Sequence, residues 1–253
     1  MTFETSHAKR PMPRIILGLG GVLEKLRSAS AELGFVNAIL YGIDQALDRP
    51  GGFAVKRYAL VAQPLAEKRR LPARRGASIA VRDLDRDDPA LAGLPLDGAV
   101  LDYRFGQGAV CLGAFKDARV IGCVWFCLGP YDEDEVRCRF VPAPGVAAWD
   151  FDFYLAPEQR GGIAFARLWD AADAYLAARG VRWTMSRISK YNSASLASHA
   201  RLGARPVGDA LFLRLGRWQL TIASLAPYVH LSRSRGPVLR LPLPDEGGTR
   251  ARR

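Results

Sequence analysis

The chain has 253 residues, 49% of them hydrophobic and 24% charged, a composition that supports a large buried core and excludes a disordered protein. Lys and Arg number 36 against 25 Asp and Glu, so an anionic partner is favoured: a phosphorylated cofactor, nucleic acid, an acidic protein or a membrane surface. No apolar run approaches the ~20 residues needed to span a bilayer.

The N-terminus has basic residues ahead of a short apolar run, which imitates a secretion signal. Glu24, Lys25 and Arg27 interrupt that pattern, so we do not expect secretion. The four cysteines, at positions 111, 123, 127 and 138, show no CxxC spacing and have no His nearby. We therefore expect no metal site, and we expect buried thiols in a reducing, cytoplasmic compartment.

Residues 15–48 carry an apolar stripe with helical spacing. Its members are Val22, Leu26, Ala29, Leu33, Val36, Leu40, Ile43 and Leu47. Gly34 is expected to divide the stripe into two helices, and the DRPGG sequence at 48–52 to end the second. The stripe either docks on the main domain, forms a homodimer or lies on an anionic membrane face.

Residues 53–65 predict a strand, and the charged, proline-containing stretch 67–76 predicts an exposed linker. A domain boundary near residue 76 follows from this pattern. We expect an N-terminal extension at 1–76, a main domain at 77–224, and a basic tail rich in Pro and Arg at 225–253. The basic cluster in 68–75 and the tail fit solvated linkers better than a binding patch.

The main domain alternates predicted strands and helices. We expect a strand at 78–84, a helix opening in 85–95, a hairpin at 108–129 around the turn KDAR, a strand at 147–156, a helix at 162–178, a strand at 181–189, a helix at 192–203 and a strand at 210–220. This order predicts an α/β (α+β) domain of mixed type.

The turn between the strand ending near Leu155 and the helix beginning near Gly162 has the sequence EQRGGIA. The first N–H groups of a helix lack partners within it, and the helix dipole adds partial positive charge. Gly161, Gly162 and Ala164 leave space for a ligand, and Arg160 adds a full charge. The turn therefore suits a phosphate or pyrophosphate, although a glycine pair before a helix also occurs as a plain turn.

The sequence QRGGIA at 159–164 resembles the pyrophosphate loop Q/R-x-x-G-x-G/A of the GNAT superfamily of acyl-CoA-dependent N-acyltransferases. The order of elements is also similar, and NSASLASHARLGARPVG resembles the family's region that begins N-x-x-A/S and closes L-G-F. The resemblance covers roughly residues 78–220. It implies a GNAT-like fold with a mostly antiparallel central sheet flanked by helices, here preceded by the N-terminal helical extension. It also implies acetyl-CoA as co-substrate and no metal.

The resemblance assigns the cofactor-binding residues. It implies that the loop amides bind the CoA pyrophosphate, that the strand ending in FDFYL splays from VRWTMS so that pantetheine lies between them, and that Asn192 contacts the pantetheine arm. The residues implied are Leu155, Gln159, Arg160, Gly161, Gly162, Ile163, Ala164, Asn192 and Ser195. Many members have Tyr seven residues after the Asn, where this chain has His199. The family's Phe after Gly203 is Ala204.

Acyl transfer to an amine needs a base for the amine and an acid for the leaving thiolate. Strand alternation predicts that Asp150 and Asp152 point to one face, where either could act as base. They could equally be solvated or hold nearby Arg side chains. His199 has an ordinary pKa of about 6.5, suited to proton exchange, and could instead be a packed helix-face histidine.

These patterns predict an N-acetyltransferase that acts on the primary amine of a small molecule or sugar precursor, in the cytoplasm or at the inner membrane face. A non-catalytic CoA-binding or partner-binding protein, and an acyltransferase that uses an acyl carrier protein, remain as alternatives. Nucleic acid is not expected as a partner, because KRRLPARR at 68–75 has no interleaved aromatic residues and no nucleic-acid-binding motif is visible.

Overall fold

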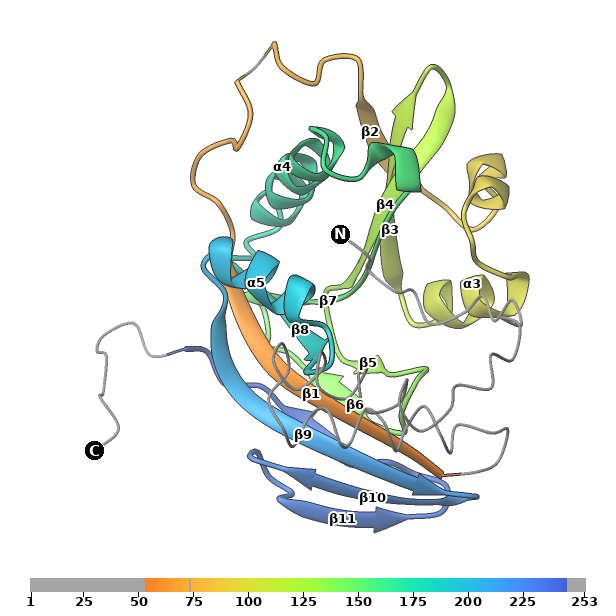
Figure 1. Cartoon of the computed structure of the whole chain (residues 1–253), viewed down its shortest axis with the longest axis vertical. Coiled ribbons are helices and arrows are strands. Elements are labelled where there is room, and N and C mark those ends of the chain that lie inside the picture. Colours follow the sequence, from red (N-terminus) through yellow and green to blue (C-terminus); the bar gives the residue numbers. More distant parts are fainter. Residues whose placement is uncertain (1–52, 73, 245–253) are drawn as a thin grey trace, which may run out of the picture.

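The computed structural model describes residues 53–72 and 74–244 (Figure 1). The predicted helices of 15–48 and the end of the basic tail lie outside the described residues. None of the helices in the described part is long and apolar enough to cross a membrane.

The strands and helices have the following bounds. The strands are β1 Phe53–Pro64, β2 Ala80–Leu84, β3 Ala109–Lys116, β4 Arg119–Cys127, β5 Tyr131–Asp132, β6 Arg139–Val141, β7 Ala147–Leu155, β8 Trp183–Ser189, β9 Arg205–Leu215, β10 Trp218–Ala223, β11 Val229–Ser232 and β12 Val238–Arg240. The helices are η1 Pro89–Gly93, α3 Gly98–Phe105, η2 Pro157–Gln159, α4 Ala164–Ala177 and α5 Ser193–Arg201, η denoting a 3₁₀ helix.

A nine-stranded sheet in the order β11-β10-β9-β1-β8-β7-β4-β3-β2 forms the centre of the molecule. Its neighbouring strands are antiparallel except for β7 and β8, which are parallel. A small sheet, β12-β6-β5, accompanies it. The predicted mixed α/β fold with a mostly antiparallel sheet is confirmed.

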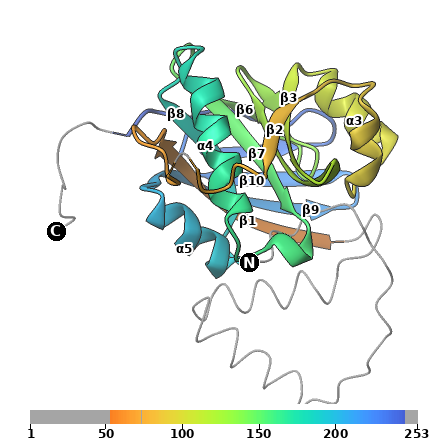
Figure 2. The same ribbon diagram turned by 90° about the horizontal axis from the view of Figure 1, so that it is seen from above.

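Helices α4 and α5 cover one face of the large sheet, and α3 and the small sheet cover the other (Figures 1 and 2). On one face, Leu168 and Trp169 of α4 pack with Phe126 and Phe153. On the other face, α3 packs over β3 and β4 through Leu101. The small sheet packs there as well, over β1, β7 and β8. The sheet is thus buried on both sides through its middle strands, which explains why β3 and β4 are nearly continuous apolar runs.

Strand β1 lies in the middle of the sheet, between β8 and β9. Its Tyr58, Leu60 and Ala62 are buried in the core beneath the small sheet. The sequence assigned this strand to a separate extension ending at residue 76, and that boundary is wrong. A strand paired on both edges belongs to the unit that it completes, whatever linker follows it.

The linker after β1 is fixed to α4. The backbone N–H groups of Arg70 and Leu71 donate to the Asp170 carboxylate at 2.8 and 3.2 Å. The Arg70 guanidinium pairs with Asp173 and lies 5.9 Å from the centre of the Trp169 ring. Proline and charge predicted an exposed linker here, but two inward-facing carboxylates on α4 hold its first half against the helix.

Three other regions differ from the sequence expectation. Residues 85–95 form only the short η1, capped by Asp88, and the helix itself is α3 after the cap Asp97. Residues 210–220 are not one strand, because Gly216, with φ +55°, turns the chain between β9 and β10. Part of the predicted tail is ordered as β11 and β12.

The remaining elements follow the sequence closely. Asp117 and Ala118 both adopt positive φ in the β3–β4 turn, the conformation that suits a tight hairpin. Helix α4 lies within two residues of its expected bounds. Asn192 caps α5, and Gly203 with φ +85° follows its end. The four cysteines are buried free thiols, as expected.

The position of β1 predicts how the full chain unfolds. Leu60→Ala should lower the free energy of unfolding by about 2–5 kcal/mol, because Leu60 is 0% exposed in the core. The whole domain should respond in one urea transition followed by tryptophan fluorescence and circular dichroism. Glu67→Ala, in the exposed part of the linker, is the control. A main transition unchanged by Leu60→Ala would contradict an integral β1.

Candidate functional site

The parallel strands β7 and β8 pair over only three positions, from Ala147 with Trp183 to Trp149 with Met185. Beyond these pairs each strand keeps its outer neighbour. β7 continues along β4 as far as Leu155, and β8 continues along β1 as far as Ser189. The centre of the sheet therefore opens into two strand edges that are not paired with each other. We call this feature the split, and its presence agrees with the splay that the sequence resemblance implied.

A β-bulge lies where the split begins. Trp125 pairs with Asp152 and Phe126 pairs with Asp150, so Phe151 is an extra residue on β7. An extra residue interrupts the alternation of side chains. Asp152 shares its face with Trp125 and α3, whereas Asp150 shares its face with Phe126 and α4. The prediction that Asp150 and Asp152 point to one face is therefore wrong.

Asp150 is 5% exposed at the start of the split. Within residues 53–72 and 74–244, no hydrogen bond or ion pair to its carboxylate is formed. Burial, and to a lesser extent the nearby Asp152 charge, raise the pKa of Asp150 to about 8. The carboxyl group is thus mostly protonated at neutral pH and becomes a base only in mildly alkaline solution.

Asp152 has a different environment from Asp150. Its Oδ2 accepts a hydrogen bond at 2.6 Å from Nη1 of Arg104, a buried residue of α3. The guanidinium also lies over the rings of Trp125 and Phe151. The Asp152 charge is therefore neutralised by a cation that the sequence analysis did not identify.

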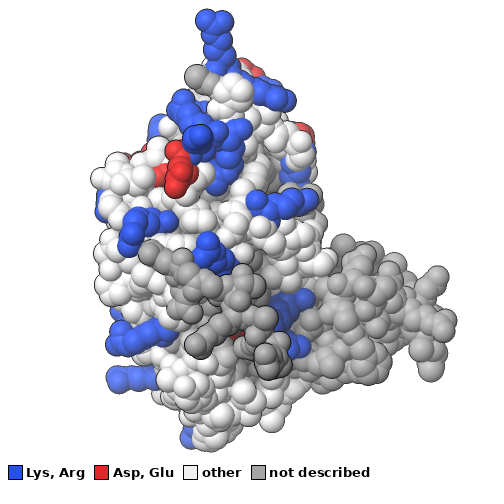
Figure 3. All heavy atoms as spheres, turned by 90° about the vertical axis from the view of Figure 1, so that its left-hand side faces the viewer, with Lys and Arg blue, Asp and Glu red and all other residues white. Residues whose placement is uncertain are grey.

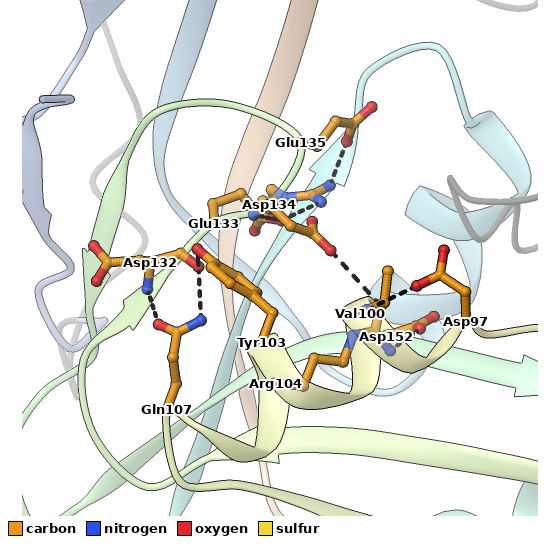
Figure 4. A network of polar contacts seen from close by, with 11 residues as sticks. Asp97, Val100, Tyr103, Arg104, Gln107, Asp132, Glu133, Asp134, Glu135 and Asp152 are labelled. Carbon is orange, nitrogen blue, oxygen red and sulfur yellow. Dashed lines mark hydrogen bonds and ion pairs between the residues drawn. The ribbon is translucent and has the colours of Figure 1, made fainter. Parts of the chain in front are cut away.

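An acidic loop, residues 132–135, meets these groups on the α3 side of the sheet (Figure 4). Glu133 accepts two hydrogen bonds, at 2.6 and 2.7 Å, from Arg187 of β8. Glu135 lies 3.2 Å from the same guanidinium and accepts a hydrogen bond from the Tyr58 hydroxyl. Asp134 approaches Arg104 at 3.9 Å. Loop, helix and three strands are thus joined by one network of buried charges.

Sequence reasoning missed this network. Arg104 sits in α3, beyond the helix start expected at 85–95, and Arg187 is one of several polar residues in β8. The run of four acidic residues at 132–135 was the one local signal, and nothing in it names distant partners.

The loop after β7 carries the predicted anion-binding residues. η2 ends at Gln159, and Gly161 follows with φ +78°, a conformation that favours glycine. Arg160 folds back so that its Nε donates to the carbonyl oxygen of Leu155 at 3.2 Å. Ile163 precedes α4 and offers no side-chain cap. In the described chain, the N–H groups of Gly161, Ile163 and Ala164 have no acceptor, so this helix start can receive an anion.

Helix α5 presents the residues implied at its start and middle. The Asn192 side chain accepts the Ser195 N–H at 2.9 Å, which gives it a capping function. His199 is 9% exposed, with its Nδ1 3.1 Å from Oε1 of Gln63 and its ring edge-on to Trp169. Burial lowers the pKa of His199 to about 4, so this imidazole is neutral at pH 7 and has no extra proton to give.

The side of the molecule that bears α4 and the linker is basic. Figure 3 shows Lys and Arg side chains spread over its described surface, with few acidic ones. In the part of the chain that the structure describes, no cluster of His, Cys, Asp or Glu could hold a metal ion.

The split, the glycine loop leading into α4, and the Asn-capped α5 occur in the order that the sequence resemblance implies. The fold is GNAT-like. No family model matches the chain, and no curated protein does either.

Several solved structures are similar to this GNAT-like domain. An aminoglycoside acetyltransferase from an uncultured soil metagenomic sample, in complex with sisomicin, is 11% identical, covers 49% of this chain and 87% of its own, and has a TM-score of 0.37. A tandem GNAT protein from the clavulanic acid biosynthesis pathway is 18% identical. The match covers 60% of this chain and 50% of that protein, with a TM-score of 0.42. A putative GNAT acetyltransferase from Novosphingobium aromaticivorans is 20% identical. The match covers 65% of this chain and 67% of that protein, with a TM-score of 0.40.

Asp150→Asn should change stability in a pH-dependent way. The raised pKa of Asp150 means that, between about pH 4 and its folded value of about 8, the unfolded chain has lost a proton that the folded chain keeps. The wild type therefore loses stability as pH rises through that window, and the amide variant does not. Urea midpoints at pH 5 and 8 should show the variant gaining relative to wild type at pH 8.

The exposed Asp87→Asn controls for the general effect of removing a carboxylate. A gain for Asp150→Asn that is equal at both pH values would contradict a protonated Asp150 in the folded protein.

Proposed function

We propose that this chain is an N-acyltransferase that transfers an acetyl group from acetyl-CoA to the primary amine of a small molecule or sugar precursor. The observation that carries the proposal is the split, in which two parallel strands stop pairing after Trp149 and Met185. A strand edge that has lost its neighbour can pair with another extended chain that contains amides. The pantetheine arm of CoA is such a chain.

The loop and α4 would hold the phosphates of CoA. The N–H groups of Gly161, Ile163 and Ala164 have no acceptor in the described chain and would bind phosphate oxygens, and the dipole of the 14-residue α4 would add to their effect. Leu155, Gln159, Gly162 and Arg160 complete the turn, and the basic surface of this side favours a polyanion. Bound acetyl-CoA supplies an activated acyl group as a thioester.

The protonation states and hydrogen bonds of the three predicted catalytic residues favour a different role for each. Asp150 lies at the start of the split and has a pKa near the operating range of a general base, so we assign it the amine proton, which the resulting carboxylic acid can pass to the leaving CoA thiolate. Asp152 is held by Arg104 and positions α3 against β7. His199 is neutral, and we assign it a hydrogen-bonding role beside Trp169 and Gln63, with Asn192 and Ser195 at the start of its helix.

A substitution in the loop tests the cofactor. Gly162→Glu should weaken acetyl-CoA and CoA binding by about tenfold or more, since bulk and like charge enter the turn. Gly162→Ala is the matched control, because the added methyl would meet only the Gln159 carbonyl oxygen at 3.4 Å. Isothermal calorimetry on the full chain measures both. Equal affinities for all three proteins would contradict a phosphate-binding loop.

The pH dependence of turnover tests Asp150. A base with a pKa of about 8 must be deprotonated to act, so kcat/KM should rise with pH and level off above about 8. Asp150→Asn should lower kcat by about 10²–10⁴ and leave CoA affinity unchanged. His199→Phe should retain a rising profile. A wild-type profile that falls across this range would assign Asp150 the opposite role, that of acid.

Activity assays on the full chain distinguish the possible acceptors and donors. CoA binding with no turnover over a broad panel of amines would favour a non-catalytic binding protein. Turnover only with an acyl carrier protein would replace CoA as donor. Either result leaves the Gly162 comparison able to report on the loop itself.

A further inference from the structure

The sheet face that bears α4 and α5 continues beyond β1 onto three more strands, where it is apolar. Opposite residues in neighbouring antiparallel strands share a face. Here the pairs are Leu215 with Trp218, Leu213 with Leu220 and Leu231, and Leu211 with Ile222 and Val229. We call these eight residues the outer apolar face.

The reverse side of these strands is part of the core, because Ala210, Phe212 and Ala223 pack beneath the small sheet. The outer apolar face is solvent-exposed by contrast. Leu215, Val229 and Leu231 are 62–65% exposed, and Trp218 is 47% exposed. A contiguous apolar surface of this kind is uncommon on a monomer and marks a site of contact.

The layer of described helices stops short of this face. α5 reaches β1 through the contact of His199 with Gln63, and α4 lies further away over β3, β4 and β7 (Figures 1 and 2). On this side, the described contacts of β9 and β10 include single side chains: Lys190 pairs with Asp209, and Arg233 lies over the Trp218 ring.

We propose that the second half of the N-terminal stripe, residues 36–47, docks on the outer apolar face as an amphipathic helix. Its apolar residues Val36, Leu40, Ile43 and Leu47 have the spacing of one helical side. The segment would continue the layer formed by α4 and α5.

The link between residues 36–47 and β1 is short, and β1 begins beside the outer apolar face. Phe53, the first residue of β1, pairs with Leu215 of the outer apolar face. The six residue steps from Leu47 to Phe53 reach at most about 20 Å, and three strand spacings from β1 to β11 span about 14 Å. A segment held this close has an effective concentration on the order of millimolar, so modest apolar contact suffices to dock it.

The dimensions of segment and face agree. Residues 36–47 would form a helix about 18 Å long. The three rows of cross-strand pairs, two residues apart, extend about 14 Å along the strands. A helix about 10 Å wide covers three strands spaced about 4.8 Å apart.

Charge favours this occupant. Residues 35–48 contain two carboxylates, Asp44 and Asp48, and neither Lys nor Arg. The rim of the face is basic, because Arg57 pairs opposite Leu211 and Arg233 lies 5.3 Å from the centre of the Trp218 ring. A segment without basic residues suits this rim better than it suits an anionic membrane.

Tryptophan fluorescence of the full chain tests the contact. Of the five tryptophans, Trp125, Trp149, Trp169 and Trp183 are buried, so acrylamide quenching reports mainly on Trp218. The double variant Leu40→Asp, Ile43→Asp should increase quenching and lower hydrogen-exchange protection in β10 and β11. Ala38→Asp, Gln45→Asp adds equal charge opposite the stripe and should resemble wild type.

A change on the sheet gives the reciprocal test. Leu231→Asp should raise hydrogen exchange in residues 36–47, whereas Tyr228→Asp, an exposed change outside the face, should not. Circular dichroism checks that each variant is folded. Because either side of the contact can be altered, one variant that fails to fold still leaves the other to decide.

Other occupants give distinct results that overturn the proposal. Equal behaviour of the two double variants would exclude docking of this segment. A wild-type dimer by sedimentation that Leu231→Asp dissociates, and Leu40→Asp, Ile43→Asp does not, would assign the face to a second copy. Protection of Trp218 that appears only with vesicles of phosphatidylglycerol and phosphatidylcholine would assign it to a membrane.

Discussion

The arrangement of the molecule depends on the point at which β7 and β8 cease to pair. Two parallel strands separate at the centre of a sheet only if each retains a partner on its other edge, and β4 and β1 supply those partners. The N-terminal strand is therefore as necessary to the site as the loop that follows β7. Without β1, the free end of β8 would have no ladder to hold it apart from β7.

The buried charges near the split differ according to their partners. Asp150 has burial without a cation in the described chain, so its proton is retained. Asp152, on the opposite face, has Arg104 and stays paired. Arg187 and Glu133 form the same kind of pair between β8 and the acidic loop. One extra residue, Phe151, separates the two aspartates into these different environments. The different protonation of the two aspartates thus derives from a bulge.

The two sides of the sheet serve different purposes. The α4 and α5 side brings together a helix start without a cap, a basic surface and a neutral histidine. The α3 side consists of paired charges and stacked aromatic rings, among them Tyr131 on Phe151 at 4.1 Å between ring centres. The first side therefore suits the polyanion of the proposed reaction, whereas the second presents fixed, paired charges. On the first side, α4 and α5 do not extend over β9 to β11, so the apolar side chains of these strands are exposed there.

The sequence by itself determined the local elements: the β3–β4 hairpin, α4, the Asn192 cap and the glycine loop, because caps, turns and periodicity depend on residues close together in the chain. It also determined the family resemblance and hence the split, through short motifs. Only the tertiary structure decided that β1 joins the central sheet, that Arg104 meets Asp152 and Arg187 meets Glu133, and that Asp150 and Asp152 face opposite ways. Those facts rest on pairing between residues that are distant in sequence and on a bulge that shifts the register, and local patterns carry no information about either.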